Sequence, residues 1–574
     1  MEMEKSPDKP TIWGGIECTI NRIGDEYKDQ LNYSGHYVRP GDLEAIADLG
    51  IDTIRYPVLW EKHQPDKNKK INWQWTDRQF ETMRDLKMTP VVGLLHHGSG
   101  PAFTHLLDPE FPYLLATYAY EVASRYPWIK YYTPVNEPLT TARFSGLYGL
   151  WYPHHTSEIS FYRMLLNELK ATVLSMKAIR SINPSAELVQ TEDLGKSHST
   201  PLLAYQANFE NDRRHLTFDI LTGRVRPGHP HYDYMIGCGI REDEIHFFLE
   251  HPFAPHILGL NYYVTSERWL DESLEKYPHQ TLGGNGRQRY ADTEVVRANP
   301  GAYSGFKILA TEIWERYGIP IAVTECHLHC TREEQLRWFK EIRDAAVELA
   351  EQGINIKAVT AWAMLGSFDW DTLLTKTGTQ YESGVFDIKT FPGRLRPTAL
   401  AHLIKYLSTG TGTLHPVLAE SGWWHPDQPV KGHDRPVVII RAAEGDSKES
   451  KDSSKLLNVL VAACNHRRIF HVTVSHFDQQ HIDRIDPWAV INLRTGNRQI
   501  RSLCLRNGLQ YVSFHKEEPA ESSLKIVIEQ MPVSIHQVNK VLDLMIDGDL
   551  GCWFFSADGM IFKSEDLSGK HQRV

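Results

Sequence analysis

The stretch IKYYTPVNEP, residues 129–138, is a short run of apolar and β-branched residues that ends on Asn-Glu-Pro. Such a run predicts a buried strand of a parallel sheet. Seven further runs share this character: TIWGGIEC (11–18), IDTIRYPVLW (51–60), MTPVVGLLHH (88–97), AELVQTEDL (186–194), HILGLNYY (256–263), IPIAVTE (319–325) and IKAVTAWAML (356–365). Helical patterns lie between them, as at 110–126 and 331–352. Eight strands alternating with helices predict a (β/α)8 barrel.

An open, doubly wound sheet is the alternative α/β architecture. It would carry a glycine-rich phosphate-binding turn after its first strand. The segment WGGIECTI (13–20) does not contain GxGxxG, so the barrel is favoured.

Composition excludes several classes of protein. The 574 residues are 41% hydrophobic and 23% charged, as in ordinary globular chains. A net charge of −10 gives no sign of a nucleic-acid surface, and no apolar run has the length of a membrane span. The start MEMEKSPDKP lacks a secretory pattern, and seven cysteines are too few for a disulfide framework. We therefore expect a cytoplasmic protein without nucleic-acid or membrane partners.

Two carboxyl groups stand at predicted strand ends, where barrel enzymes carry their chemistry. Asn136 and Glu137 end the fourth strand, and Glu325 ends the seventh. A lone glutamate at such a place could simply pair with a surface cation. Two of them on opposite walls of one barrel mouth meet the requirement of glycoside cleavage, in which a carboxyl pair flanks the scissile bond.

Residues 11–409 resemble glycoside hydrolase family 1, a family of retaining (β/α)8 glycosidases. The resemblance is carried by WGGIECTIN (13–21), IRYP (54–57), LLHH (94–97), NEP (136–138), NYY (261–263), VTE (323–325) and WAMLGSFDW (362–370).

The resemblance implies a role for each matching residue. Glu137 would be the acid/base and Glu325 the nucleophile, supported by Arg55, Asn136 and Tyr263. The residues implied to bind the sugar are Asn21, His97, Trp362, Asp369 and Trp370. No metal and no cofactor are implied.

Several positions depart from the family pattern. Asn21 replaces a glutamine and Asp369 a glutamate, so each side chain is one methylene shorter. Gly98 stands where an aromatic residue usually follows the histidine, and Cys326-His327 replaces Asn-Gly after the nucleophile. These changes leave the identity of the sugar open.

Three other candidates have ordinary interpretations beside the functional ones. The run ECHLHC (325–330) holds metal-ligand residue types but lacks the second pair of a structural zinc site, so no metal is expected. Glu192, at the end of the fifth strand, could line the pocket or be solvated. Trp13 lies near the start of its strand, which favours packing inside the barrel.

The sequence divides into a barrel over 1–410, a linker or covering loop over 411–434, and a smaller α/β domain over 435–574. The last region reads as β-α-β-β and resembles a Rossmann-type sugar-nucleotide reductase similar to dTDP-4-dehydrorhamnose reductase. It is degenerate, because RAAEGDSKESKD (441–452) holds one glycine and Tyr511 is followed by Lys516 instead of a lysine four residues on. We expect no bound dinucleotide.

The leading hypothesis is a retaining exo-β-glycosidase, β-glucosidase-like, that acts on a small saccharide or glycoside. The alternatives are a transglycosylase using the same carboxyl pair, a sugar-nucleotide oxidoreductase, and a sugar-binding protein without turnover. The sequence leaves open the sugar, the linkage, the choice between hydrolysis and transglycosylation, and assembly into a homo-oligomer.

Overall fold

The computed structural model describes most of the first 441 residues and parts of the remainder. The described residues are 9–274, 277, 281–328, 332–378, 380–389, 394–425, 435–441, 453–454, 456–461, 464, 469, 471–494, 498–513, 525–528, 542, 553–555 and 561–563. They form two compact units. The first comprises Met1–Ser197, Gln206–Ser266 and Ser304–Glu420, and the second comprises His198–Tyr205, Glu267–Tyr303 and Ser421–Val574.

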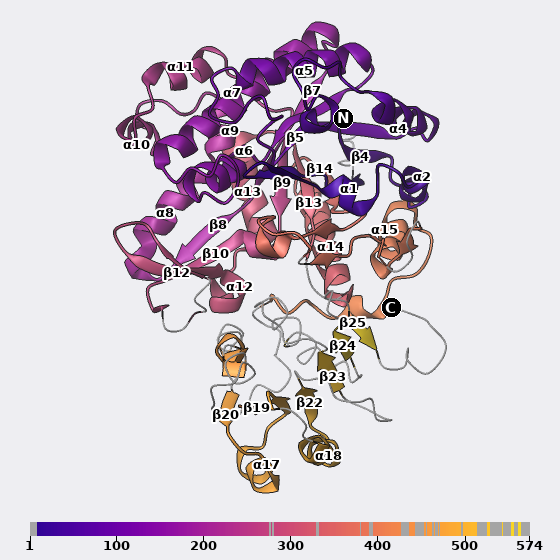
Figure 1. The fold of residues 1–574 in the computed structure, drawn as a ribbon, viewed down its shortest axis with the longest axis vertical. Coiled ribbons are helices and arrows are strands. Elements are labelled where there is room, and N and C mark those ends of the chain that lie inside the picture. Colours follow the sequence, from indigo (N-terminus) through magenta and orange to yellow (C-terminus); the bar gives the residue numbers. More distant parts are fainter. Residues whose placement is uncertain are drawn as a thin grey trace, which may run out of the picture. The chain divides into compact units, whose positions relative to one another are not determined.

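The first unit is built around a closed barrel of eight parallel strands (Figure 1). In order around the barrel the strands are β1 (Thr11–Gly15), β14 (Ile356–Ala361), β13 (Ile321–Cys326), β9 (Ile257–Tyr262), β7 (Glu187–Asp193), β6 (Tyr131–Asn136), β5 (Thr89–His96) and β4 (Thr53–Pro57). Seven of them lie within the predicted runs, and β13 extends one residue beyond its run of 319–325, to Cys326. The predicted (β/α)8 barrel is therefore confirmed.

Helices surround the barrel strands (Figure 1). The longer ones are α4 (Gln74–Asp85), α5 (Phe111–Arg125), α7 (Glu158–Ile182), α8 (Ala204–Arg213), α11 (Glu242–Glu250), α13 (Gly305–Tyr317), α14 (Arg332–Glu351) and α15 (Ala399–Thr409). The shorter ones are α1 (Gln30–Ser34), α2 (Asp42–Ala47), α3 (Trp60–His63), α6 (Pro138–Ala142), α9 (Leu216–Leu221) and α10 (Tyr232–Gly237).

The helix ends follow from local sequence. Ser157 precedes α7 and its hydroxyl accepts the backbone N–H of Ser160, which satisfies a donor that the first turn leaves unpaired. Helix α13 ends at Gly318, whose φ of 64° is left-handed and is adopted most easily by glycine.

The barrel interior is filled by side chains from alternate strand positions. Trp13, Val91, Val189, Ile257, Ala322 and Ala358 form one buried cluster. The packing role predicted for Trp13 is confirmed. Part of the predicted covering loop also packs on this unit, because Arg337 of α14 donates its Nε–H to the carbonyl of Val417 (3.1 Å).

Small antiparallel elements lie at the mouth and rim of the barrel unit. They are the hairpin of β2 (Ile20–Ile23) with β3 (Glu26–Asp29), the pair β15 (Ser367–Phe368) and β16 (Tyr381–Glu382), and the pair β17 (Phe386–Asp387) and β18 (Arg396–Pro397). Gln30, directly after β3, exchanges hydrogen bonds with the backbone of Phe368. This contact joins the first hairpin to the segment that carries Asp369.

The second unit contains a seven-stranded sheet. Its strand order is β20 (His471–Val474), β19 (Val437–Ile440), β21 (Ala489–Asn492), β22 (Gln510–Ser513), β23 (Lys525–Ile528), β24 (Trp553–Phe555) and β25 (Ile561–Lys563). All neighbours are parallel except β24 and β25. Val437 and Ile439 belong to one apolar cluster and Val438 and Ile440 to another, so β19 is buried on both faces.

The unit also holds β10 (Glu267–Asp271), β11 (Leu282–Gly284), β12 (Arg289–Glu294) and the helices α12 (Val295–Ala298), α17 (Gln479–Ile485) and α18 (Arg498–Arg506). The expectation of a further α/β region is confirmed. The residues expected to replace the glycine-rich turn, 442–446, and Lys516 lie outside the described residues.

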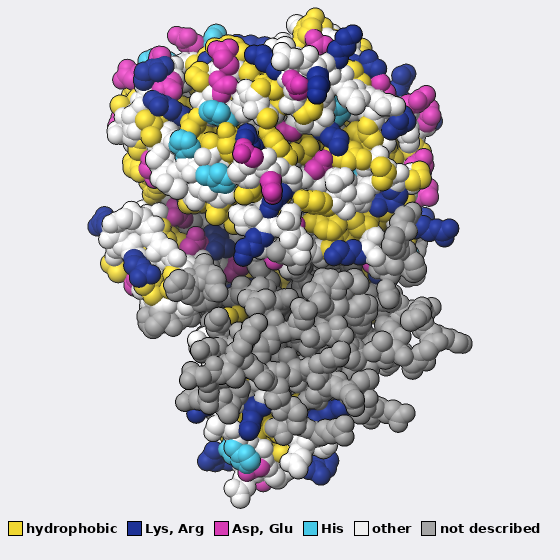
Figure 2. Space-filling model, in the orientation of Figure 1, with side chains coloured by type: hydrophobic (Ala, Val, Ile, Leu, Met, Phe, Trp, Pro, Cys, Tyr) yellow, Lys and Arg dark blue, Asp and Glu magenta, His cyan; other side chains and the backbone are white. Residues whose placement is uncertain are grey.

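The visible face of the barrel unit carries acidic and basic side chains interspersed, without a large field of one sign (Figure 2). Within the part of the chain that the structure describes, no helix combines the length and apolar character needed to cross a bilayer.

Candidate active site

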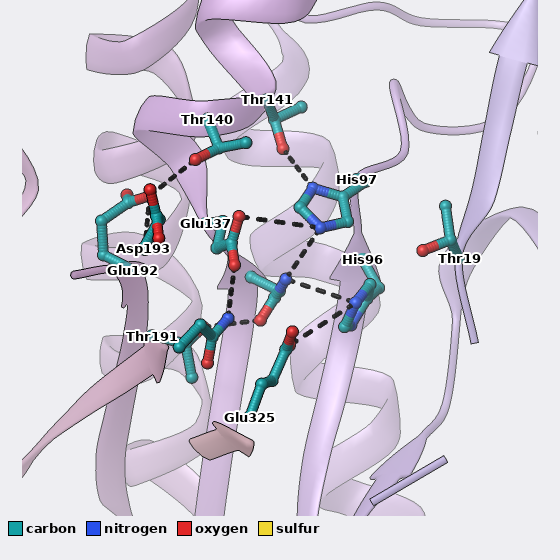
Figure 3. Close-up of polar contacts among 12 residues, drawn as sticks. Thr19, His96, His97, Glu137, Thr140, Thr141, Thr191, Glu192, Asp193 and Glu325 are labelled. Atoms are coloured by element: carbon teal, nitrogen blue, oxygen red, sulfur yellow. Dashed lines mark hydrogen bonds and ion pairs between the residues drawn. The ribbon is translucent and has the colours of Figure 1, made fainter. Parts of the chain in front are cut away.

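The two predicted catalytic carboxyls occupy the tips of β6 and β13. Glu137 follows β6 directly and has left-handed backbone angles (φ 45°, ψ 61°), which begin helix α6. Glu325 lies within β13. Their side chains are only 5% and 3% exposed, and they extend toward one another across the barrel mouth (Figure 3). The structure therefore brings the predicted pair together.

Glu325 is held by donors on both carboxylate oxygens. Arg55 of β4 donates from Nη1 to Oε1 (2.9 Å), and the hydroxyl of Tyr263 donates to Oε2. Burial raises the pKa of Glu325 above its ordinary value, while the guanidinium and the phenol act in the opposite direction. The two donors therefore favour the ionised carboxylate more than burial alone would allow, and they fix its position.

Glu137 has a different environment. Asn261 of β9 donates from Nδ2 to Oε1 (2.5 Å), and His97 Nε2 lies 3.8 Å from Oε2. Burial, and then the negative charges of Glu325 and Glu192, raise the pKa of Glu137 well above its ordinary value. These surroundings favour the protonated form of the carboxyl, which is what a general acid requires.

Asn136 connects the two halves of the site. Its Oδ1 accepts from Arg55 Nη2 (2.7 Å) and from the hydroxyl of Thr191 (2.8 Å). Its Nδ2 lies 3.3 Å from Nε2 of both His96 and His97. Since an amide nitrogen donates, both Nε2 atoms accept. Burial lowers the pKa of His97 to about 3 and holds that of His96 well below its ordinary value, so both rings are neutral.

Three of the predicted sugar-binding residues lie around this centre. The ring of His97 is 5.6 Å from that of Trp370, and Trp362 stacks on His96 with centroids 5.5 Å apart and an interplanar angle of 7°. Arg55 lies over the ring of Trp362 at 4.8 Å. The aromatic residues therefore frame the side of the site on which the two histidines lie.

Asn21 and Asp369 occupy less direct positions. The carboxylate of Asp369 accepts backbone N–H groups of its own loop, from Gly378 (3.0 Å) and Gln380 (3.3 Å). Asn21 is fully buried on β2, and neither polar atom of its amide has a hydrogen-bond partner among the described residues. Asn21 pairs in register with Lys28, whose pKa is lowered by burial and raised in turn by Asp369. The hairpin thus carries Asn21 to the side of the site where Asp369 lies.

Two residues that support Glu137 were not among the predicted catalytic and sugar-binding residues. Asn261 lies in β9, and Tyr263, two positions on, directly follows that strand. Both side chains reach the carboxyl pair, so the NYY motif was a usable signal. Glu192 is buried and accepts the N–H of Leu139 (2.9 Å) and the hydroxyl of Thr217 (2.6 Å). It thereby fixes the first turn of α6 behind Glu137. Glu192 is a buried structural carboxyl, and the alternative of a solvated group is wrong.

The run after the nucleophile shows no metal geometry in its described part. Cys326 is buried, and His327 Nε2 lies 3.1 Å from Glu382 Oε2. His329 and Cys330 lie outside the described residues. Among the described residues, no three His, Cys, Asp or Glu side chains are grouped as they would be around a metal ion.

Comparison with known proteins agrees with this geometry. The sequence pattern of glycosyl hydrolase family 1 matches residues 9–381. The mouse lactase-like protein is 30% identical over 184 residues, which are 29% of this chain and 31% of that protein. Beta-glucosidase 34 of rice is 25% identical over 141 residues, 23% of this chain and 28% of that protein. The matches thus span about a third or less of these relatives.

Solved structures share the fold over a longer stretch. A family 1 β-glucosidase from Thermotoga maritima superposes with a TM-score of 0.57 at 15% identity, covering 71% of this chain and 99% of that one. The AHE enzyme from Alicyclobacillus herbarius gives 0.54 at 16% identity, covering 65% and 86%. The Thermotoga maritima enzyme has also been solved with deoxynojirimycin, where the TM-score is 0.57 at 15% identity, covering 71% of this chain and all of that one.

Proposed function

This chain belongs to glycosyl hydrolase family 1, and we propose that it is an exo-acting β-glycosidase, β-glucosidase-like, that works with retention of configuration. The observation that carries the proposal is the difference between two buried carboxyls in one barrel mouth. Glu325 is bonded by a guanidinium and a phenol, whereas Glu137 is bonded by a neutral amide and feels the charges of three other carboxyls. Retaining glycosidases need one ionised nucleophile and one protonated acid.

The reaction follows from these assignments. In the first step the Glu325 carboxylate attacks the anomeric carbon, the bond to the leaving oxygen breaks, and Glu137 donates its proton to that oxygen. The product is a glycosyl ester of Glu325. In the second step Glu137, now a carboxylate, takes a proton from a water molecule that attacks the anomeric carbon. The ester bond breaks, the sugar leaves with its original configuration, and both carboxyls return to their starting states.

The test is a panel of aryl β-glycosides carrying glucose, galactose, fucose, mannose and xylose, with natural disaccharides beside them. We expect turnover of at least one, with the β-anomer as the first product by NMR. Release of the α-anomer would contradict the nucleophile assignment. If no glycoside of the panel is hydrolysed but sugars are bound, the alternative of a sugar-binding protein without turnover would be favoured.

The recessed carboxylate of Asp369 leads to a prediction about sugar choice. The side chain ends about 1.5 Å short of where a glutamate would reach, and its oxygens accept from Gly378 and Gln380. We expect Asp369→Glu to change the ratio of kcat/KM among glucoside, galactoside and fucoside by about tenfold, and to change the best rate less. Equal loss on all three sugars would show that Asp369 only holds its loop.

For the C-terminal region over 435–574 we propose a Rossmann-like unit, joined to the barrel through 411–434, that binds no dinucleotide. The strand order β20-β19-β21 reverses beside β19, which is where doubly wound folds bind nucleotides at the strand ends. The residues that follow β19 include Ala442, Ala443, Glu444 and Asp446, in place of glycines that admit a pyrophosphate. Two carboxylates there would repel it.

The prediction for this region is a null titration. NADH and NADPH are added to the full chain and binding is followed by calorimetry. We expect no binding with a Kd below about 1 mM. A sugar-nucleotide reductase that binds its dinucleotide serves as positive control. Micromolar binding would contradict the proposal and support the oxidoreductase alternative.

We further propose a cytoplasmic location, which is supported by the finding that none of the described cysteines is in a disulfide.

A further inference from the structure

A group of buried polar atoms lies beside His97, apart from the catalytic carboxyls. The atoms are Thr19 Oγ1, Asn21 Oδ1 and Nδ2, Glu61 Oε2 and Ser99 Oγ. All four side chains are buried, and none of these atoms has a hydrogen-bond partner among the described residues. Buried polar atoms in folded proteins nearly always have a partner, supplied by protein, water or ligand. Several such atoms on neighbouring residues therefore mark a place where a polar ligand could supply the missing partners.

The geometry at Gly98 shows that these residues are neighbours. A Cβ added at Gly98 would lie 2.0 Å from Glu61 Oε1 and 3.0 Å from the carbonyl oxygen of Ile20. Ile20 stands between Thr19 and Asn21, and Ser99 follows Gly98. The carboxyl of Glu61, from α3, thus occupies the space that a side chain at residue 98 would fill.

The group is connected to the reaction centre through its neighbours. Gly98 follows His97, whose Nε2 lies 3.8 Å from Glu137. Thr19 donates its N–H to Glu17 (2.9 Å), and Glu17 in turn accepts a hydrogen bond from Trp370. Figure 3 shows the Thr19 hydroxyl directed toward His96 and His97, on the other side of these rings from Glu137. The group therefore adjoins the histidines of the site on the side away from Glu137.

The state of Glu61 suits a sugar hydroxyl. Its Oε1 accepts the N–H of Gly100 (3.2 Å), which leaves Oε2 available. Burial raises the pKa of Glu61 to about 8, so at neutral pH the carboxyl keeps a proton. With Oε1 accepting from the backbone, that proton is on Oε2, where it can be donated. A neutral acid of this kind can both donate to a hydroxyl and accept from one.

We propose that Glu61 is a specificity-determining residue, which together with Asn21 binds sugar hydroxyls remote from the cleaved bond, and that Gly98 is required because any side chain there would displace it. The proposal rests on the glycosidase function above and adds a residue to its sugar site. It also explains why residue 98 is small, since the carboxyl of Glu61 fills the space that a side chain at 98 would occupy.

The experiment compares Glu61→Ala and Glu61→Gln on 4-nitrophenyl β-glucoside and β-galactoside and on their 3-, 4- and 6-deoxy analogues. We expect Glu61→Ala to lower kcat/KM on the intact sugar by about 100-fold, and on the analogue lacking the bound hydroxyl by less than about threefold. Glu61→Gln should keep activity within about fivefold, because its carbonyl replaces Oε1 and its amide group replaces the protonated Oε2. Equal loss on every sugar, or no loss on any, would overturn the proposal.

Gly98→Ala supplies a second arm. In the presence of Glu61 it should act like Glu61→Ala, whereas in the Glu61→Ala background it should add little, because the atom it would strike is gone. Additive effects of the two substitutions would contradict a shared space. Thermal melting of each variant separates loss of sugar recognition from loss of folding.

A binding readout separates this proposal from the glycosidase function. In the Glu325→Gln background, Kd values for the same glycosides come from tryptophan fluorescence without turnover. A selective, deoxy-dependent rise in Kd on Glu61→Ala supports the sugar contact even if the wild type cleaves nothing. If the wild type cleaves glycosides but Glu61→Ala leaves the Kd values unchanged, the role proposed for Glu61 is wrong and the glycosidase function still stands.

Discussion

Replacing Glu325 with glutamine is expected to lower kcat by about 10⁴-fold or more on every glycoside that the wild type cleaves, because a nucleophile has no substitute within its site. Arg55 and Tyr263 both donate to this carboxylate, and neither can form the glycosyl ester. The glutamine is isosteric and its carbonyl can still accept from Arg55, so the fold should persist. The measurements are steady-state kinetics and a thermal melt of the same preparation.

Glu187→Gln is the matched control for this experiment. Glu187 is the first residue of β7, at the opposite end of the barrel from the strand tips, and forms an ion pair with Lys130 (2.8 Å) that is partly exposed. An exposed pair of this kind contributes about 0–1 kcal/mol, so its loss should leave kcat and KM unchanged. A comparable loss of activity in Glu187→Gln would show that the effect at Glu325 is not specific to the site.

The identity of the nucleophile can be read from a rescued product. In Glu325→Ala, azide can enter the space of the missing carboxylate. It would then attack the anomeric carbon of a β-glycoside from the face that the carboxylate would have attacked, opposite the leaving group. One displacement then gives an α-glycosyl azide. A β-glycosyl azide from this variant would contradict the assignment, because it would require that another nucleophile had acted first.

The barrel could be predicted from the sequence because each strand carries its own local signal. The eight apolar runs are continuous in sequence, and the carboxyls at the ends of two of them, Glu137 and Glu325, are placed by the general rule that barrel chemistry sits at strand tips. The resemblance to the family then supplied Arg55 and Tyr263, whose contacts with Glu325 the structure shows.

The rest of the site depends on contacts between distant segments, which a single sequence does not encode locally. Glu192 supports Glu137 through the backbone of Leu139, 53 positions away. Glu61 and Gly98 meet only because α3 packs against the end of β5, and no motif joins them. Asp369 was predicted to face the sugar from the family pattern, but the loop that supplies N–H groups to its carboxylate became visible only in three dimensions.

The environments of the two carboxyls also predict the pH profile. With the proposed roles, activity requires Glu325 ionised and Glu137 protonated, so kcat/KM should fall as pH drops through the pKa of Glu325 and as pH rises through that of Glu137. The pKa of Glu137 is raised well above its ordinary value by burial and by neighbouring carboxyls. The alkaline limb should therefore lie at a higher pH than an ordinary glutamate would give. It should be missing in Glu137→Gln, which has no proton to lose.

Glu137→Gln is expected to give an effect that depends on the leaving group. For a 2,4-dinitrophenyl glycoside, which leaves without protonation, the first step should stay within about tenfold of the wild type. For a natural disaccharide the loss should reach about 10²–10⁴-fold, the usual contribution of a general acid. The difference would appear as a steeper dependence of kcat/KM on leaving-group pKa than in the wild type.

In Glu137→Ala, azide should replace water in the second step and give a β-glycosyl azide, since two displacements restore the configuration. Opposite azide anomers from the two alanine variants would assign both roles in one experiment. A loss of kcat/KM in Glu137→Gln that is equal for all leaving groups would contradict the assignment of Glu137 as the general acid.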